Sequence, residues 1–449
     1  MPLWFQTALL PEGWKQGVRL LESDGSITGV EAGVEPAPDD EQHGVALPGL
    51  CNVHSHGFQR GMAGLAEVRG PKGDNFWTWR EVMYRFLDRL GPDEVQAITS
   101  LAYIEMLERG FTRVGEFHYL HHSPSGNPYA NVGELTERIA AAADASGIGL
   151  TLLPVFYAHA NFGGAPPTYG QRRFINTVDQ FATLVEASRR VVAKLPGANL
   201  GVAPHSLRAA TPDELHAVLS VAGGGPVHIH AAEQTKEVDD CMMWSGQRPV
   251  EWLLDHAAVD EHWCLVHATH PVPSEMAALA TSGAVAGLCP ITEANLGDGI
   301  FPARDYFQLS GRIGIGTDSN IQINAAAELR ALEYAQRLST RSRNVLSDGE
   351  GRSTGRALFD RALAGGNQAL GQSHYGIRQG APTDLVSLNL DDPVFFGSKG
   401  DAILDSWIFA GGAVDCVWRR GRKVVQHGRH TERQEITGHY RRAIESVLV

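Results

Sequence analysis

Residues 211–231, TPDELHAVLSVAGGGPVHIHA, contain a helix signal followed by a strand signal. The opening tetrapeptide TPDE is typical of a helix start, where a capping side chain precedes a proline and acidic residues. The stretch predicts a helix over Pro212–Val221 and a short apolar strand over Val227–Ala231. This strand ends next to a polar side chain, His230.

The same alternation of apolar strands and helical stretches recurs on both sides of this unit. The other predicted strands are Ala46–Asn52, Arg113–Phe117, Thr151–Tyr157, Asn199–Ala203, Cys264–Ala268, Ala284–Leu288 and Arg312–Gly316. The other predicted helices are Pro92–Arg109, Asn131–Ser146, Asp179–Ala193, Pro273–Thr281 and Ala325–Leu338. Eight strands alternating with helices favour a closed (β/α)₈ barrel with a parallel sheet. An open doubly wound sheet is the alternative, but no GxGxxG follows the first predicted strand.

The two chain ends have a different pattern, in which short β-like runs alternate with turn residues. We expect these ends to pair in one small β-sandwich domain beside the barrel. The expected boundaries are 1–46 and 375–449 for the small domain and 47–374 for the barrel. The C-terminal part includes the run AILDSWIF, residues 402–409, as a predicted strand.

Composition limits the classes of function. The chain has 449 residues, 43% of them hydrophobic, which is enough to build a sizeable core. Its formal net charge of −13 argues against a general nucleic-acid binder, which needs a basic face. The five cysteines are scattered and never spaced CxxC, which argues against a disulfide framework. The sequence shows no secretory signal and no apolar run long enough for a membrane span, so we expect a cytoplasmic protein without membrane partners.

Polar residues collect where the predicted strands end. The segment NVHSHGFQR places His54 and His56 two residues apart, so that both imidazoles face the same side of a strand. His230, His267 and Asp318 follow three other predicted strands. The carboxyl ends of barrel strands converge on one site. Imidazoles and a carboxylate brought together in this way suit zinc or a similar divalent ion.

In this order along the chain, the residues resemble those of the amidohydrolase superfamily of metal-dependent hydrolases. The resemblance implies a metal site made of His54, His56, His230 and Asp318. Members with two metals carry a lysine after strand four, but the segment LGVAPHSLR has none. The absence of this lysine implies the one-metal, deaminase-like branch of the superfamily. Zn²⁺ is the expected ion, and Fe²⁺ and Mn²⁺ are open alternatives. In that branch the HxxE motif, here ending at Glu233, carries protons.

The loop segments resemble one group of this superfamily more closely. The segments are HSHGFQRGMAG, GDNFWTWREVMY, GEFHYLHH, APHSLRA, HIHAAEQTKEV and LCPITEANLGDG. They resemble members that convert N-formimidoyl-L-glutamate and water to N-formyl-L-glutamate and ammonia, a step of histidine degradation. The relatives also imply a homodimer.

This substrate defines the remaining expected roles. The expected catalytic residues are Glu233 as general acid, His267 as stabiliser of the tetrahedral intermediate and Asp318 as proton acceptor. His270 competes with His267, which lies nearer to its strand end. The expected substrate-binding residues are Gln59, Arg80, Tyr119, His205 and Arg208, because guanidinium groups bind carboxylates through two hydrogen bonds.

Two other interpretations remain open at this point. The first is an amidohydrolase deaminase that acts on a guanine- or cytosine-like heterocycle. The second is a catalytically silent barrel used for binding or assembly, which would lack at least one ligand or the acid. None of these residue types is missing from the sequence.

Overall fold

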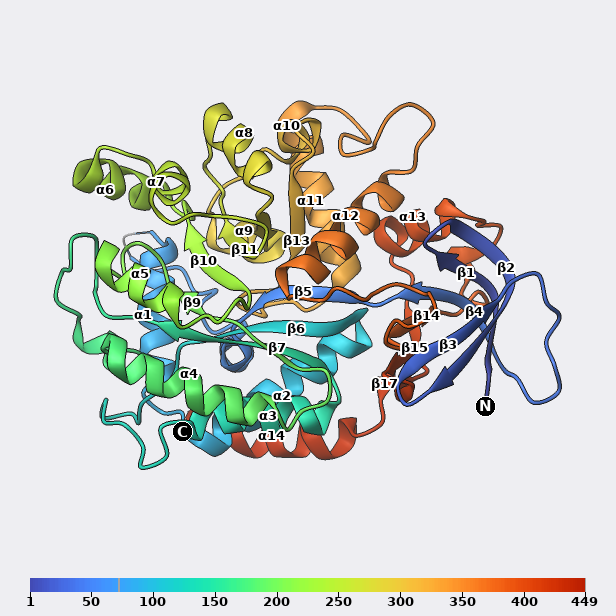
Figure 1. Cartoon of the computed structure of the whole chain (residues 1–449), viewed down its shortest axis with the longest axis horizontal. Helices are drawn as coiled ribbons and strands as arrows, with labels where there is room; N and C mark the ends of the chain where they lie inside the picture. The colour runs from blue at the N-terminus through green and yellow to red at the C-terminus, as the bar shows by residue number, and fades with distance from the viewer. Residues whose placement is uncertain (72, 449) are drawn as a thin grey trace.

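A parallel sheet that closes on itself forms the centre of the molecule (Figure 1). The computed structural model describes residues 1–71 and 73–448. The strands of this sheet are β5 (Leu50–Ser55), β6 (Phe111–His118), β7 (Gly149–Phe156), β8 (Asn199–Leu200), β9 (Ala203–Pro204), β10 (Val227–Ala231), β11 (Trp263–His267), β12 (Val285–Leu288) and β13 (Arg312–Ile315).

Hydrogen bonds close the ring at two places. β13 pairs with β5, so the last strand lies beside the first. Bridges from Val202 to Val227 and from Ser206 to His230 join the β8–β9 region to β10. The short β8 and β9 together occupy the fourth position, since both pair with β7. The predicted barrel is therefore confirmed.

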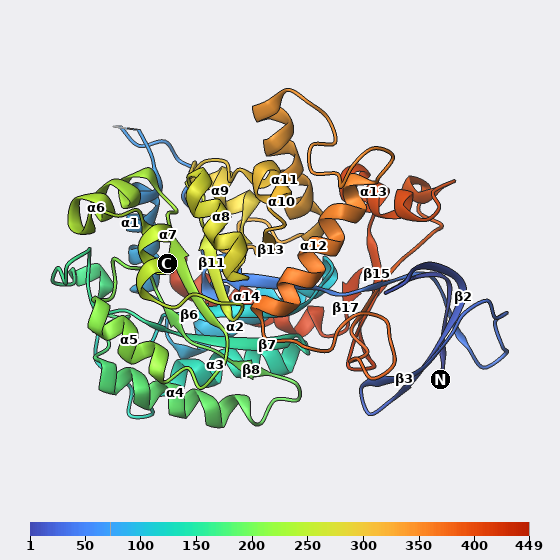
Figure 2. The same cartoon turned by 45° about the horizontal axis from the view of Figure 1, so that its top comes forward.

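Helices surround the barrel and cover the outer face of its strands (Figures 1 and 2). They are α1 (Phe76–Leu87), α2 (Pro92–Glu108), α3 (Glu134–Ser146), α4 (Val178–Val192), α5 (Pro212–Ser220), α6 (Thr235–Ser245), α7 (Pro249–His256), α8 (Pro273–Ser282), α9 (Pro290–Leu296), α10 (Ala303–Gln308), α11 (Ala325–Thr340) and α12 (Thr354–Ala369). Short 3₁₀ turns lie at η1 (Gly57–Met62), η2 (Tyr169–Gln171) and η3 (Pro393–Phe395). Because helices cover one face and side chains fill the other, strands such as β6 and β7 are buried along their whole length.

A second sheet unites the two chain ends. Its strands, in spatial order, are β17 (Arg429–His430), β16 (Arg422–Gln426), β15 (Val414–Arg419), β14 (Leu385–Leu388), β4 (Glu41–Pro48), β1 (Leu3–Leu10), β2 (Gly13–Ser23) and β3 (Ser26–Glu31). The antiparallel pair of β4 with β14 joins the N-terminal half to the C-terminal half. The proposed boundaries between the small domain and the barrel stay a prediction.

The strand predicted over Ala46–Asn52 is wrong as a single element. The structure divides it at Gly49, so that β4 belongs to the small sheet and β5 to the barrel. A Cβ atom at Gly49 would overlap the side chain of Thr112, which explains why the chain passes from one sheet to the other at a glycine. The small sheet therefore lies at the amino end of β5, away from its carboxyl end.

The strand predicted from AILDSWIF is also wrong, because this run lies within the helix α13 (Asp401–Ala410). Its buried residues Ile403, Leu404, Trp407 and Ile408 form one helical stripe, a spacing of 3.6 residues per turn rather than the alternation of a strand. The last helix, α14 (Arg433–Leu448), leaves the small sheet and packs against α2 (Figure 1).

Two further observations concern the environment of the chain. Across residues 1–71 and 73–448, no helix combines the length and the apolar character that a membrane span requires. The five cysteines are free thiols and all of them are buried.

The contact between α12 and β13 gives a test of this packing. A Cβ atom at Gly365 of α12 would overlap the carbonyl oxygen of Ile313 in β13. We expect Gly365→Ala to lower the free energy of unfolding by about 1–3 kcal/mol, because the backbone of the helix must move away from the strand. Gly438→Ala in α14 is the matched control, since its Cβ would meet only Arg442 Nη1 at 3.8 Å. That change should raise stability by about 0.5–1 kcal/mol. Urea denaturation of both variants measures the difference, and equal effects would contradict this packing.

Candidate active site

The carboxyl end of β5 supplies two imidazoles to the mouth of the barrel. His54 and His56 are both buried and lie two residues apart, so that their rings converge on the same side. His56 Nδ1 lies 3.0 Å from the carbonyl oxygen of Phe117. Because a carbonyl only accepts, Nδ1 carries the proton and Nε2 keeps its lone pair.

His230 at the end of β10 is oriented in the same way. Its Nδ1 lies 2.9 Å from the carbonyl oxygen of His205, which leaves the lone pair on Nε2. This Nε2 atom lies 3.1 Å from Nε2 of His54. Burial lowers the pKa of His54 to about 3 and that of His230 well below its usual range. Both rings are therefore neutral, as metal ligands must be.

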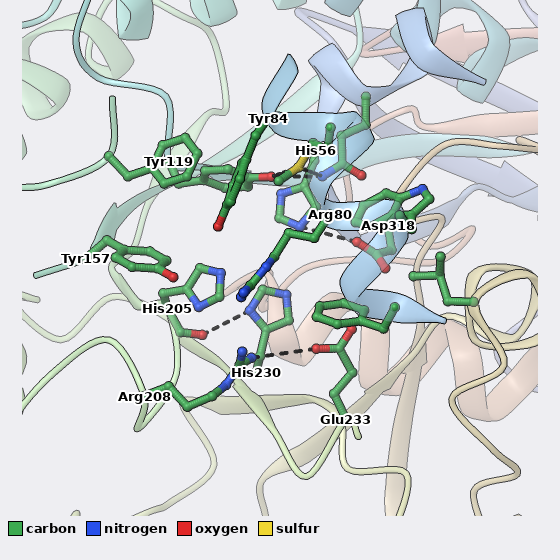
Figure 3. A pocket seen from close by; sticks show the side chains of 16 residues that line it. His56, Arg80, Tyr84, Tyr119, Tyr157, His205, Arg208, His230, Glu233 and Asp318 are labelled. Carbon is green, nitrogen blue, oxygen red and sulfur yellow. Dashed lines mark hydrogen bonds and ion pairs between the residues drawn. The ribbon is translucent and has the colours of Figure 1, made fainter. Parts of the chain in front are cut away.

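Asp318 completes this cluster from the loop after β13. Its Oδ1 atom lies 3.4 Å from Nε2 of His54. The same atom lies 3.2 Å from Nε2 of His56, a contact drawn in Figure 3. The residue has a left-handed backbone with φ of +43°, a conformation that the surrounding structure must hold in place.

The chemistry of these atoms fits a divalent cation. Nε2 of His56 and Nε2 of His230, each with a free lone pair, cluster with Nε2 of His54 and Oδ1 of Asp318 through contacts of 3.1–3.4 Å, and a divalent cation among these atoms would be attracted to all of them. The outer nitrogens of His56 and His230 are held by carbonyl groups, as is usual for metal-bound histidines. Two overlapping groups of buried side chains could hold a metal ion: one is His54, His56 and Asp318, and the other is His54, His230 and His267. Together they form a histidine-rich candidate metal site that includes the four predicted ligands.

Glu233 and His267 lie beside this cluster. Glu233 Oε1 is 3.7 Å from Nε2 of His267, and the same nitrogen is 3.9 Å from Oδ2 of Asp318. Burial raises the pKa of Glu233 to about 7, so that this carboxyl group can exchange a proton near neutrality. Burial lowers the pKa of His267, but the Glu233 carboxylate and the hydrogen bond to Glu293 outweigh it and raise the value to about 10.

A cavity opens above these residues. Arg80 on α1 and Arg208 after β9 point into it (Figure 3). Among the described residues, no carboxylate lies within ion-pair distance of Arg80, whose guanidinium stacks over the ring of Trp77 at 4.5 Å. Arg208 is buried, and its Nη2 atom lies 3.8 Å from carboxylate oxygens of both Glu233 and Glu237.

The neutral residues predicted to bind substrate line the same cavity. Gln59 Nε2 donates to the hydroxyl of Tyr119 at 2.8 Å, and that hydroxyl lies 3.1 Å from the sulfur of Met83. The buried Oε1 atom of Gln59 has no partner in the described part of the chain. His205 reaches the cavity next to Arg208, and burial holds its pKa well below the usual range.

The structure thus brings every predicted site residue to one place. His56, Gln59, Arg80, Tyr119, His205, Arg208, His230, Glu233 and Asp318 line the cavity. His54 and His267 lie just behind its wall, in contact with the ligand cluster. His270, the competitor of His267, binds the carbonyl oxygen of Asp298 instead.

Further side chains of the site were not predicted, four of them titratable. Tyr84 and Tyr157 line the cavity, while Glu237 contacts Arg208 and Glu293 contacts His267. Only Glu237 has a sequence signal, because it is a second acidic residue four positions after Glu233 in HIHAAEQTKEV.

Comparisons with known proteins agree with this geometry. The Amidohydrolase family model matches residues 45–424, and a model described as Formimidoylglutamate deiminase HutF, N-terminal domain, matches residues 4–44. Formimidoylglutamate deiminase of Pseudomonas aeruginosa is 51% identical over 432 residues, which cover 95% of each chain. An 8-oxoguanine deaminase of the same organism is 29% identical over 403 residues, 84% of this chain and 83% of its own. The crystal structure of an amidohydrolase from Brucella melitensis is 54% identical, covers 100% of both chains and has a TM-score of 0.97.

The facing lone pairs predict that a metal ion stabilises the fold. We expect chelator-treated protein to unfold at a lower temperature than protein loaded with Zn²⁺. The bound ion should raise the free energy of unfolding by about 4 kcal/mol when free metal is a thousandfold above Kd. His230→Ala should abolish this response. His262→Ala, which removes a histidine from the surface group Asp260, Glu261 and His262, is the control and should keep it. Thermal denaturation with and without Zn²⁺ measures the effect, and equal melting temperatures for the two parent forms would contradict the metal site.

Proposed function

Because the chain belongs to the amidohydrolase family and, within it, groups with formimidoylglutamate deiminase, we propose that it hydrolyses N-formimidoyl-L-glutamate to N-formyl-L-glutamate and ammonia. This substrate carries a linear amidine and two carboxylates. The observation that carries the proposal is a single cavity that joins a metal-ligand cluster, the buried acid Glu233 and the guanidinium groups of Arg80 and Arg208. The reaction is a step of histidine degradation.

One divalent ion per chain, Zn²⁺, is the proposed cofactor. Three imidazoles and one carboxylate are a ligand set that zinc accepts with a position left open for water. The fourth barrel position offers Ala203 and Pro204 rather than a lysine that could bridge two ions. When bound, the ion would lower the pKa of a water molecule to about 7 and so provide a nucleophile near neutral pH.

The residues around the ligand cluster supply the proton transfers. Asp318 accepts a proton from the attacking water at its Oδ2 atom, because the contacts with His54 and His56 are made by Oδ1. His267 Nε2 faces the site and donates a hydrogen bond to the oxygen as the tetrahedral intermediate forms. Glu233 protonates the imino nitrogen and receives in its place the proton that Asp318 took from the water. It then protonates the departing amine, and the hydroxyl proton of the intermediate returns to Glu233 as the formyl group forms and ammonia leaves.

The proposed binding of the two carboxylates rests on charge. Arg80 offers an unpaired guanidinium, and Arg208 contacts its acidic neighbours only at 3.8 Å, so both can form closer, two-pronged bonds to a carboxylate. Gln59, Tyr119 and His205 add hydrogen-bond donors to the same wall. A flat, neutral purine or pyrimidine would leave the guanidinium of Arg80 desolvated without a counter-charge, so a heterocycle is disfavoured.

The compartment and the assembly complete the proposal. Buried, free cysteines suit a reducing compartment, and we place the enzyme in the cytoplasm. The homodimer implied by its relatives stays a prediction.

An ammonia-release assay tests the proposed function directly. N-formimidoyl-L-glutamate is compared with guanine, cytosine and adenosine at equal concentration. We expect ammonia from the amidine alone, and the proposal is falsified if a heterocycle is hydrolysed faster.

Substitution of the acid gives a second prediction. Glu233→Gln should bind metal as the parent does, because Glu233 is not one of the proposed ligands. Its turnover should fall by roughly 10²–10⁴-fold, since the side chain can no longer deliver a proton to nitrogen. Steady-state kinetics together with metal analysis of the same sample measure both properties. Near-normal turnover would remove Glu233 from the mechanism.

The guanidinium groups give a third prediction. Arg80→Met and Arg208→Met should each lower kcat/KM by roughly 30- to several-thousand-fold, because a substrate carboxylate loses its partner at a cost of about 2–5 kcal/mol. Arg→Lys should rescue only in part, because an ammonium cannot form the two-pronged contact. N-formimidoyl-L-glutamine lacks one of the two carboxylates. For this analogue, the loss of kcat/KM should be smaller in the variant that removes the arginine proposed to bind the missing carboxylate.

The control for these variants is Arg85→Met. Arg85 lies on α1 like Arg80 but is exposed and outside the cavity. It should keep parent kinetics. If all three methionine variants behave alike, the arginines do not bind the substrate.

A further inference from the structure

The segment LCPITEANLGDG, residues 288–299, has no part in the chemistry described so far. It leaves β12 and forms the short helix α9 together with the turn after it. Its side chains nevertheless reach the segments that carry two of the proposed catalytic groups, His267 and Glu233. Glu293 contacts His267, and Asp298 bonds to Gln234, which follows Glu233 in the chain.

Glu293 is held rigidly behind the imidazole of His267. Its carboxylate is buried, and Oε1 accepts the backbone N–H of Cys289 at 2.8 Å. The same Oε1 atom lies 3.2 Å from Nδ1 of His267. A carboxylate that accepts a bond from Nδ1–H fixes both the rotation of the ring and the position of that proton.

The opposite nitrogen of the ring faces the reaction. His267 Nε2 lies 3.7 Å from Glu233 Oε1 and 3.9 Å from Asp318 Oδ2. It is buried and has no hydrogen-bond partner among the described residues. The backbone at His267 and Ala268 is left-handed, with φ of +67° and +46°. Local backbone preference disfavours this conformation, so contacts with the surrounding structure must hold the His267 ring in place.

We propose that Glu293 is a positioning residue, whose carboxylate binds Nδ1–H of His267 and so aims Nε2–H at the oxygen that attacks the substrate. This inference rests on the proposed function. Glu293 touches neither the substrate cavity nor the metal ligands, and its effect passes through His267 alone. Removal of its charge should therefore slow the chemical step and leave substrate binding unchanged, because Arg80 and Arg208 lie on other loops.

A second buried carboxyl group, which binds the same helix α9 from outside it, provides a matched control. Glu328 of α11 is fully buried, and its Oε2 atom accepts the backbone N–H of Ile291 at 2.9 Å. Like Glu293 it binds the N-terminal turn of α9, but it makes no hydrogen bond or ion pair with His267. Burial raises the pKa of Glu328 well above its usual range, so glutamine closely reproduces its neutral form.

The experiment compares Glu293→Gln and Glu328→Gln with the parent enzyme. For each protein, kcat and KM for N-formimidoyl-L-glutamate are measured, with metal content and melting temperature from the same preparation. We expect Glu293→Gln to lower kcat by about 10–100-fold, the usual effect of losing a residue that orients a functional imidazole, with KM unchanged. Glu328→Gln should keep both constants.

The outcomes separate this inference from the proposed function. An inactive parent defeats the proposed function. An active parent with parent-like kcat in Glu293→Gln, or equal losses in both variants, overturns the role of Glu293. If Glu293→Gln fails to fold or to bind metal, Glu293→Asp decides, because it keeps the charge but withdraws it from the ring. A lower kcat with unchanged KM then supports positioning, and parent kinetics contradict it.

Discussion

Closure of the barrel between β13 and β5 is the interaction on which the site depends. At this seam the backbone N–H of Asp318 donates to the carbonyl oxygen of His54 at 2.9 Å, so two proposed metal ligands are also hydrogen-bond partners in the sheet. On the far side of the ring, the N–H of His230 donates to the carbonyl of His205 at 3.0 Å. The same contacts that close the ring therefore bring the ligands together. An open sheet with these strands would leave β5 and β13 on separate edges.

The link between barrel closure and the position of the proposed ligands explains why much of the site could be predicted from the sequence. Strands of a parallel barrel are buried on both faces, so they read as short apolar runs, and a polar residue at the end of a run stands out. His54, His56, His230, His267 and Asp318 were found in this way. Because the carboxyl ends of barrel strands converge on one site, the barrel topology predicts that these residues are neighbours.

The parts that could not be predicted depend on contacts between distant segments. Glu293 reads in the sequence as an acidic residue near a helix start, and only the packing of α9 against the end of β11 shows that it binds His267. The division of Ala46–Asn52 depends on the contact between Gly49 and Thr112, which are far apart in the chain. The helix α13 was misread because a short apolar run suits a buried strand and a buried helix equally well.

The charge of the chain imposes a last constraint on an anionic substrate. A net charge of −13 repels a dicarboxylate at long range, but solution ions screen that field beyond about 8–10 Å. Inside the cavity, at contact distance, the guanidinium groups of Arg80 and Arg208 are the proposed partners of the two carboxylates. Recognition in this site must therefore come from short, directional bonds. A substrate whose carboxylates do not reach both groups gains nothing from the protein's overall charge, so in the proposed binding mode the spacing between Arg80 and Arg208 selects for substrate length.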